Sequence, residues 1–242
     1  MISVCMATHN GGKYLREQIS SIITQLTEND ELIVSDDGST DDTLEVLHSF
    51  NDDRIKIYHY NPPKGLPGFR YATLNFENAL KYAKGDYIFL ADQDDVWKEG
   101  KVQVSLDYLE KYDYVVSDAI VTDANLNVLS DTRFVKEEMI HTNRYMAVLF
   151  STPYQGSCAA FRRNLLSKAL PFPKNLQSHD RWIGNVAAFY FKYKIIPEKL
   201  IYYRRHEDTT SNTFGGARPV GPFKTICYKL VYVRGLIQLL WK

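Results

Sequence analysis

The sequence predicts a single α/β domain whose central, mostly parallel sheet is flanked by helices. Short apolar runs alternate with amphipathic stretches over the first hundred residues, and this order builds a parallel sheet wrapped by helices. Three of the apolar runs end in acidic or glycine-containing segments. The length of 242 residues, with 45% apolar and 24% charged residues, suits one large domain with its own core.

The first hundred residues contain four expected strands and three expected helices. Apolar residues at steps of three and four, from Leu15 to Leu26, predict the first helix. Ser39 is expected to cap the second helix, which runs through Leu47, because Asp42 follows three residues later. The third helix is expected over 73–83, and the strands over 2–8, 32–35, 55–59 and 87–91.

The second half of the chain is less regular. Strand character recurs at 114–121, 156–162 and 193–203, and a helix is expected around 182–191. We find no internal repeat and no linker, so the second half is expected to complete the same domain.

The tail from 223 to 242 predicts an amphipathic, basic helix. It has four cations and no acid, and apolar residues recur at helical spacing: Ile226, Leu230, Val233, Ile237 and Leu240. Such a helix can lie on an anionic membrane surface. The alternative is that it docks on its own domain or on a partner subunit, which leaves oligomerisation open.

The bulk composition excludes some classes of partner and compartment. The formal net charge is zero, so nothing points to nucleic acid. The three cysteines are far apart in the sequence and lack metal-ligand spacing. There is no signal peptide and no apolar run of about 18 residues. We therefore expect a cytoplasmic protein, with the tail as a peripheral contact on the inner face of the membrane.

The acidic end of the expected strand 87–91 is the strongest indication of a site. Asp92, Asp94 and Asp95 follow this strand directly, and side-chain alternation predicts that Asp92 and Asp94 point the same way. An acidic surface turn is the alternative for any isolated Asp-x-Asp. The segments at 8–12, 36–38 and 92–95 would, however, meet at one sheet edge, where ligands bind in such folds. A divalent cation suits these carboxylates.

Five motifs in order resemble the family 2 glycosyltransferases, which have the GT-A fold, a Rossmann-like domain. They are Ser3–Asn10 with Tyr14-Leu15, Asp36–Asp41, Gly85–Trp97, Ser178–Trp182 and Tyr203–His206. The Asp-Gln-Asp-Asp-x-Trp form is similar to a subgroup described as rhamnosyltransferase-like. Residues 207–210, Glu-Asp-Thr-Thr, depart from that subgroup's usual continuation. We expect a GT-A domain over 1–215, with a nucleotide-binding half at 1–100 and an acceptor-binding half at 101–215, followed by the helical tail at 216–242.

The resemblance implies an enzyme that moves a sugar from a UDP- or dTDP-sugar to a glycan or lipid-linked saccharide, with inversion, in surface polysaccharide synthesis. Its cofactor would be Mn²⁺ or Mg²⁺. A sugar-phosphate nucleotidyltransferase is an alternative hypothesis, but residues 7–16 lack the Gly-rich, Arg-containing loop of that class. A non-catalytic module that binds nucleotide or glycan is the second rival, against which the retained acids argue.

The resemblance also implies residue roles. Asp94 would hold the metal, and His206 would either complete the metal shell or bind the pyrophosphate. Asp180 would be the general base, with helix capping as its alternative. The nucleotide would contact Thr8, Asn10, Asp36, Asp37, Asn75, Asp92, Arg204 and Arg205, and which of the paired aspartates faces the base is open. The donor or acceptor sugar would contact Asp95, Trp97, His179 and Trp182. The alternative for Asp95 is a supporting partner of the metal site, and for His179 a positioning or structural residue. Loop 130–157 is expected to close over the donor.

Overall fold

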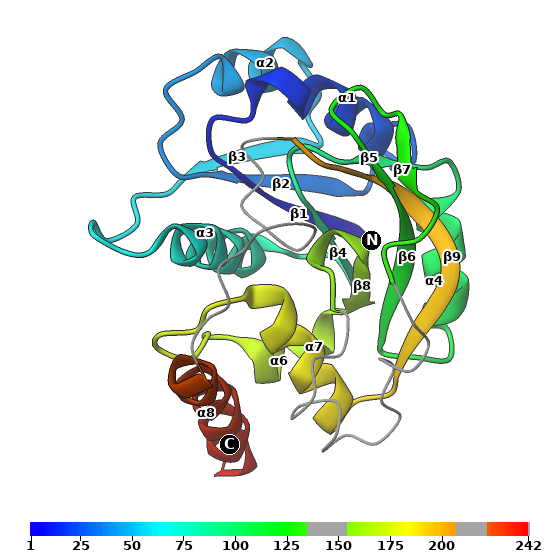
Figure 1. The fold of residues 1–242 in the computed structure, drawn as a ribbon. Helices are drawn as coiled ribbons and strands as arrows, with labels where there is room; N and C mark the ends of the chain where they lie inside the picture. Colours follow the sequence, from blue (N-terminus) through cyan, green and yellow to red (C-terminus); the bar gives the residue numbers. More distant parts are fainter. Residues whose placement is uncertain (135–153, 207–221, 242) are drawn as a thin grey trace.

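A nine-stranded sheet organises the chain (Figure 1). The structure is a computed structural model that describes residues 1–134, 154–206 and 222–241. The strand order is β3-β2-β1-β4-β8-β6-β9-β5, with β7 beside β6. The prediction of an α/β fold with a central sheet flanked by helices is confirmed, but the sheet is mixed rather than mostly parallel, because four of its strand pairings are parallel and four are antiparallel. Most of loop 130–157, which is expected to close over the donor, lies outside the described residues. Residues 207–210, which differ from the subgroup's motif, lie wholly outside them.

The first half forms the parallel part of the sheet. Its strands are β1 (Ile2–Thr8), β2 (Glu31–Asp36), β3 (Ile55–His59) and β4 (Tyr87–Ala91). In the register of the strands Thr8 lies beside Asp36, and Met6 beside Ala91. The carboxyl ends of β1, β2 and β4 therefore meet at one edge, as the sequence predicts.

Three helices cover the two faces of this half (Figure 1). They are α1 (Gly12–Ile23) and α2 (Thr43–Ser49) on one face, and α3 (Gly68–Tyr82) on the other. Helix α2 begins at Thr43 rather than at Ser39, because the Ser39 hydroxyl donates to Asp36 instead of capping a helix. Helix α3 begins five residues earlier than predicted, directly after Pro67.

The second half adds antiparallel and mixed pairing. Strands β6 and β9 run parallel, and β8 runs antiparallel to both β4 and β6. The elements are β5 (Val96–Trp97), α4 (Lys101–Leu109), β6 (Tyr114–Thr122), β7 (Val128–Ser130), η2 (Gly156–Cys158), β8 (Ala159–Arg162), η3 (Arg163–Leu165), α6 (Leu166–Ala169), α7 (His179–Tyr190) and β9 (Tyr193–Arg204). The expected strand 156–162 thus begins with a 3-10 turn. Helix α7 begins three residues early because Ser178 caps it, its hydroxyl accepting from the Arg181 N–H.

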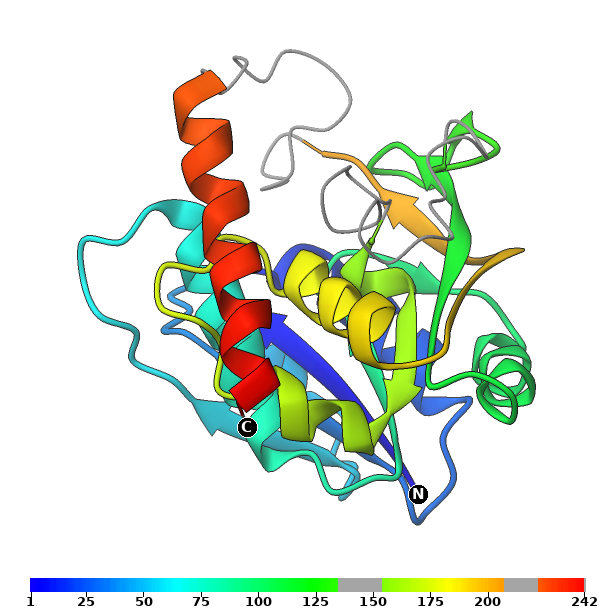
Figure 2. The same ribbon diagram turned by 90° about the horizontal axis from the view of Figure 1, so that it is seen from below.

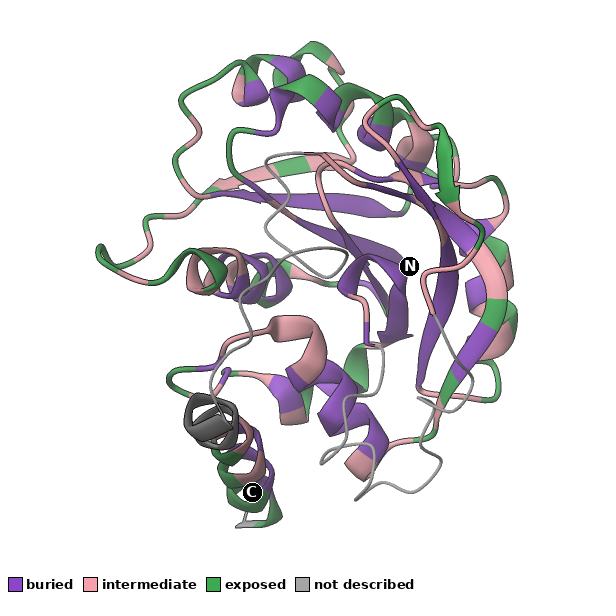
Figure 3. Cartoon of the chain, viewed as in Figure 1, coloured by how far each residue is buried: buried purple, intermediate pink, exposed green. Residues whose placement is uncertain are grey.

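Apolar side chains on both faces of the sheet form the core (Figure 3). Phe89, Tyr114 and Trp182 are among its largest fully buried members. Cys5 and Cys158 are buried free thiols, and burial raises the pKa of Cys158 to about 12. These two cysteines therefore pack as small apolar residues.

The tail helix docks on the domain by a face other than the predicted stripe. It comprises α8 (Pro222–Gln238) and η4 (Leu239–Trp241), and it lies on the same side of the sheet as α7 (Figure 2). Its buried residues are Tyr232, Leu236 and Leu239, and the Tyr190 hydroxyl donates to the Leu236 carbonyl at 2.8 Å. In the predicted stripe Val233 is partly buried, and the exposed members are Leu230 at 58%, Ile237 at 52% and Leu240 at 62%. The side chain of Ile226 is outside the described residues. In the described parts of the chain, none of the helices combines the length and apolarity needed to span a bilayer.

Candidate active site

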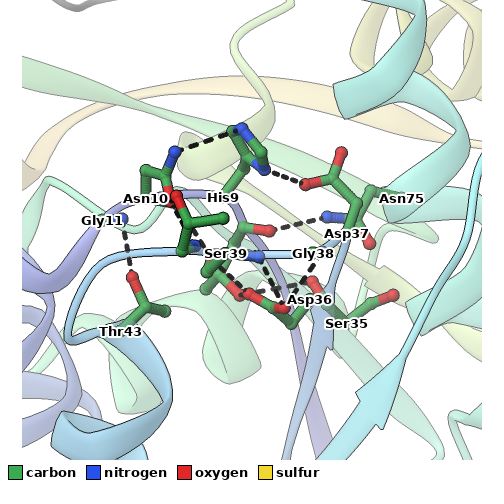
Figure 4. A network of polar contacts seen from close by, with 12 residues as sticks. His9, Asn10, Gly11, Ser35, Asp36, Asp37, Gly38, Ser39, Thr43 and Asn75 are labelled. Carbon is green, nitrogen blue, oxygen red and sulfur yellow. Dashed lines mark hydrogen bonds and ion pairs between the residues drawn. The ribbon is translucent and has the colours of Figure 1, made fainter.

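Asp36 builds the loop after β2 and has no acceptor capacity left (Figure 4). Its carboxylate accepts from the Thr8 hydroxyl at 3.1 Å, the Ser39 hydroxyl at 2.5 Å, and the N–H groups of Gly38 and Ser39, each at 3.1 Å. A carboxylate offers about four acceptor positions, so these four bonds satisfy it. Gly38 has φ +90°, which only glycine adopts readily. The expected contact between Asp36 and the nucleotide base would have to replace one of these bonds, and it stays a prediction.

The neighbouring Asp37 faces a different partner. Its Oδ1 lies 2.7 Å from His9 Nδ1, and its N–H donates to the Thr8 carbonyl at 3.2 Å (Figure 4). Burial raises the pKa of Asp37, while the His9 charge acts in the opposite direction. Of the two aspartates left open by the sequence, Asp37 is the one whose carboxylate is not consumed by its own loop.

Thr8 and Asn75 lie beneath this loop. Thr8 is 1% exposed and Asn75 is 2% exposed, and the Asn75 amide donates to the Thr8 carbonyl at 3.0 Å. Their expected contacts with the nucleotide stay predictions. Both residues fix the end of β1 against β2 and α3.

Asn10 and Gln93 join the three loops at the sheet edge. Asn10 is exposed, has φ 49°, and accepts from the Thr40 N–H at 2.8 Å through Oδ1. Gln93 accepts from the His9 N–H at 2.9 Å and donates to the His9 carbonyl at 3.1 Å. Sequence reasoning missed Gln93, because it lies between two acids, Asp92 and Asp94, that carry the motif.

The acids after β4 separate into two groups. Asp95 is fully buried, and its Oδ1 accepts from the Arg204 N–H at 3.0 Å. Asp94 is partly exposed, and its Oδ2 lies 2.8 Å from His206 Nε2. Of the two roles expected for Asp95, its burial and its bond to the Arg204 backbone suit a residue that supports the metal site better than one that contacts the sugar.

Asp92 faces both Asp94 and the first turn of α7. Burial raises the pKa of Asp92 to about 7, the charges of Asp94 and Asp180 add to this rise, and a hydrogen bond with Ser157 opposes it. Three carboxylates therefore share one region, at the end of β4 and the start of α7.

Asp180 occupies the first turn of α7 rather than its capping position. Its Oδ1 accepts from the Ser178 hydroxyl and from the Arg181 N–H, the latter at 2.6 Å. His179 stacks on Phe76 with ring centroids 3.9 Å apart, and burial lowers its pKa. Burial therefore favours the uncharged form of the His179 ring, while the Asp180 charge opposes that change.

Two tryptophans expected to contact sugars are core residues. Trp97 is 3% exposed and packs near Phe89, and Trp182 is 1% exposed and donates to the Ala169 carbonyl at 2.8 Å. Burial of this degree favours a packing role over sugar binding for both tryptophans.

Two arginines after β9 differ in their surroundings. Arg204 is 4% exposed and donates to Asp94, Ala124 and Glu17, so its guanidinium is bound within the protein. The backbone N–H of Arg205 donates to the Thr122 carbonyl at 2.9 Å, and its side chain is half-buried. A diphosphate contact remains a prediction for Arg205.

Lys101 is a site-adjacent residue that the sequence did not indicate. It is fully buried, donates to the Ser157 carbonyl at 3.2 Å and lies 5.0 Å from the centre of the Trp97 ring. Burial lowers its pKa to about 8, and the charge of Asp95 opposes that change. In the sequence Lys-Glu-Gly-Lys it resembles an ordinary exposed helix start.

The Asp94 and His206 pair suits a divalent cation that is also held by phosphate oxygens. Within the described ranges there is no group of three His, Cys, Asp or Glu side chains arranged to hold a metal ion. A cation such as Mg²⁺ commonly takes one or two carboxylates and completes its shell with substrate phosphates and water. An oxygen and an imidazole nitrogen within 2.8 Å of each other therefore fit such a cation as a partial protein shell.

Comparison with protein families and curated proteins gives consistent matches. The family model described as glycosyl transferase family 2 matches residues 3–170. An uncharacterized glycosyltransferase of Haemophilus influenzae is 28% identical over 239 residues, which cover 88% of this chain and 68% of that protein. The Escherichia coli UDP-Glc:alpha-D-GlcNAc-diphosphoundecaprenol beta-1,3-glucosyltransferase WfgD is 34% identical over 111 residues, which cover 46% of this chain and 42% of WfgD.

Solved structures share the fold. S. aureus TarS 1–349 in complex with UDP-GlcNAc has a TM-score of 0.72 at 18% identity, covering 96% of this chain and 66% of that one. The mannosyltransferase PcManGT of Pyrobaculum calidifontis, in complex with GDP-Man and Mn²⁺, has a TM-score of 0.62 at 17% identity, covering 96% of this chain and 69% of that one. The chain thus spans between 42% and 69% of the lengths of these four proteins.

Proposed function

The chain belongs to glycosyl transferase family 2, and from that membership we propose that it transfers a sugar from a UDP- or dTDP-sugar to a saccharide or lipid-linked acceptor, with inversion at the anomeric carbon. The observation that carries the proposal is the effect of Asp180 on Asp92. The Asp180 charge raises the pKa of Asp92. Asp180 of α7 and the acids at the end of β4 are therefore close enough to contact the same substrate. Inversion needs a base on one side of the sugar and a stabilised leaving group on the other.

Asp180 is the proposed general base. It accepts the proton of the acceptor hydroxyl, whose oxygen then bonds to the anomeric carbon as the bond from that carbon to the diphosphate oxygen breaks. The electron pair leaves with the diphosphate. The Ser178 hydroxyl and the Arg181 N–H hold Asp180 Oδ1, which orients the carboxylate for this transfer.

Asp94 and His206 are the proposed protein ligands of Mn²⁺ or Mg²⁺. A bound divalent cation neutralises the charge that grows on the diphosphate. PcManGT is in complex with GDP-Man and Mn²⁺, which supports the use of a divalent cation. Asp92, between this pair and Asp180, would position the cation or the ribose, and Arg205 would contact the diphosphate.

The nucleoside is proposed to lie at the ends of β1 and β2. Asn10 is exposed at this edge, and Asp37, whose own side chain is 5% exposed, pairs there with the exposed His9. The complex of TarS with UDP-GlcNAc and the name of WfgD support uridine. The rhamnosyltransferase-like motif makes a dTDP-sugar the alternative donor.

A lipid-linked acceptor and contact with the inner face of the membrane are the final parts of the proposal. The name of WfgD states a diphosphoundecaprenol-linked acceptor. Helix α8 leaves Leu230, Ile237 and Leu240 exposed beside Arg234, a pattern that suits an anionic lipid surface. Surface polysaccharide synthesis would supply such acceptors at the membrane.

Calorimetric titration of UDP and dTDP, each with and without Mn²⁺, tests the donor site. We expect metal-dependent binding of one nucleotide, lost in Asp94→Asn and kept in Asp53→Asn, an exposed acid outside the site. Asp180→Asn should keep the binding and lower transfer about 10²- to 10⁴-fold. Binding without transfer by the wild type would favour the non-catalytic module, and pyrophosphate release from a nucleoside triphosphate would favour the nucleotidyltransferase. Binding of neither nucleotide would overturn the donor assignment.

A further inference from the structure

We propose that Arg204 is a positioning residue that holds Asp94 and His206 in place, and that it is not a ligand of the diphosphate. The inference rests on the proposed function for the roles of Asp94 and His206. The contacts of Arg204 itself are properties of the fold.

Arg204 connects four segments of the chain. Its Nε donates to the Asp94 carbonyl at 2.8 Å, its Nη1 to the Ala124 carbonyl at 2.7 Å, and its Nη2 to Glu17 Oε2 at 2.5 Å. Its backbone N–H donates to Asp95 Oδ1 at 3.0 Å. One residue thus ties the end of β9 to α1, to the acidic end of β4 and to the turn after β6.

The same residues enclose the His206 ring. The Arg204 guanidinium lies 4.7 Å from the centre of the Tyr14 ring, and the Tyr14 and His206 ring centroids are 4.6 Å apart. Tyr14 and Glu17 lie three residues apart on α1, so they share one face of that helix. Tyr14 contacts both His206 and Arg204, while Glu17 binds the guanidinium.

These contacts fix both members of the proposed metal pair through their backbones. Arg204 holds the carbonyl of Asp94, and His206 follows Arg204 by two residues. The 2.8 Å separation of Asp94 Oδ2 and His206 Nε2 therefore depends on the position in which Arg204 holds the end of β9. Groups that orient metal ligands in this way typically change metal affinity about 10- to 100-fold when removed.

The environment of Arg204 argues against a role in binding phosphate. The residue is 4% exposed, each of its three guanidinium nitrogens donates to the protein, and Glu17 balances its charge. A phosphate ligand must present free donors to the substrate. The planar guanidinium also reaches three separate acceptors, which a lysine ammonium cannot reproduce.

Binding measurements on Arg204→Lys test the proposal, with Arg16→Lys, an exposed arginine of α1, as the matched control. We would follow free Mn²⁺ by electron paramagnetic resonance and titrate UDP, dTDP and the matching monophosphates at saturating Mn²⁺. We expect Arg204→Lys to weaken Mn²⁺ binding about 10-fold or more. The ratio of diphosphate to monophosphate affinity should stay within about threefold of the wild type. A fall in that ratio of about tenfold, with Mn²⁺ affinity unchanged, would overturn the proposal and make Arg204 a diphosphate ligand.

A metal-free measurement separates this inference from the proposed function. The imidazole resonances of His206, assigned with His206→Gln, should shift in Arg204→Lys and stay unchanged in Arg16→Lys. Unchanged resonances in Arg204→Lys would overturn the inference even if the wild type bound nucleotide. A shift would support it even if the wild type bound none, a result that would reject only the proposed function. If Arg204→Lys does not fold, Glu17→Gln removes the same ion pair from a half-exposed residue, and a smaller shift of His206 is expected.

Discussion

The side-chain amide of Gln93 pairs with both backbone polar groups of His9, accepting from its N–H at 2.9 Å and donating to its carbonyl at 3.1 Å. The pairing holds the loop after β1 against the loop after β4. The pairing also explains why position 11 is glycine, since a Cβ there would lie 2.3 Å from Gln93 Oε1. Gln93 therefore acts as a structural link between two of the three loops of the candidate site.

Gly11→Ala should displace Gln93 from His9. Loss of the two hydrogen bonds is expected to lower the free energy of unfolding by about 1–3 kcal/mol, measured by urea denaturation. Gln93→Ala removes the same bonds and should have a similar effect.

The double variant Gly11→Ala with Gln93→Ala provides the control. Because both changes remove the same two bonds, the double variant should lose clearly less than the sum of the single losses. Additive losses would mean that Gly11 and Gln93 act independently, contrary to this interpretation.

Asp92→Asn should change how stability depends on pH. The pKa of Asp92 is raised from 3.8 to about 7, so between these values the folded state retains a proton that the unfolded state releases. The free energy of unfolding of the wild type therefore falls as pH rises from about 4 to 7. The Asn variant escapes this loss and should become more stable than the wild type above pH 7, by roughly 1–2 kcal/mol after allowance for partial exposure.

Thermal unfolding from pH 4 to 8 in chelator-treated buffer checks this prediction. The advantage of Asp92→Asn should be near zero at pH 4 and should level off above pH 7. The exposed control Asp53→Asn should show no such trend. An advantage that does not vary with pH would contradict the raised pKa.

Much of the fold could be predicted because its signals are local. The alternation of apolar strands and amphipathic helices over the first hundred residues defines β1 to β4, and the acids at their ends mark one edge of the sheet. The helical tail was also predictable, but its buried face was not. Both sides of α8 are apolar, and only the packing of Tyr232, Leu236 and Leu239 on the domain decides between them.

The roles of individual site residues depend on long-range contacts that no spacing encodes. Asp36 and Asp37 are neighbours in one motif, yet the loop consumes one carboxylate and leaves the other beside His9. Arg204 sits in a motif suited to phosphate, but Glu17, 187 residues away, binds its guanidinium. Trp97 and Trp182 are buried by elements distant in sequence.

Gly156→Ala should reduce turnover more than stability. A Cβ at this position would lie 3.0 Å from His179 Nε2 and 3.3 Å from the Asp180 Cβ, so the start of α7 must shift by a few tenths of an ångström. Since small misplacements of a catalytic group reduce rates strongly, we expect kcat to fall about tenfold, measured by release of the nucleoside diphosphate.

Ser167→Ala changes an exposed residue of α6 and serves as a control, so its kcat and Tm should match those of the wild type. The Tm of Gly156→Ala should stay within about 4 °C of the wild type, corresponding to about 1 kcal/mol. Wild-type turnover in Gly156→Ala would argue against Asp180 as a base whose position matters.

The exposed face of α8 should determine binding to lipid. Leu230→Ser combined with Ile237→Ser removes two large apolar side chains that are more than half exposed, so the fold should be preserved while the lipid contact is lost. We expect the wild type to float with vesicles containing anionic lipid and the double variant to float at least about tenfold less. Arg234→Glu should weaken flotation on anionic vesicles, because it reverses a charge at the lipid surface.

Two comparisons decide whether this face binds lipid specifically. Neutral vesicles should bind the wild type more weakly, since the electrostatic attraction is absent. Gel filtration at increasing protein concentration should show the same oligomeric state for the wild type and the Leu230→Ser, Ile237→Ser variant. If the wild type instead forms a dimer that the double variant cannot form, and neither floats, then the outward face of α8 covers a second copy of the chain and not a membrane.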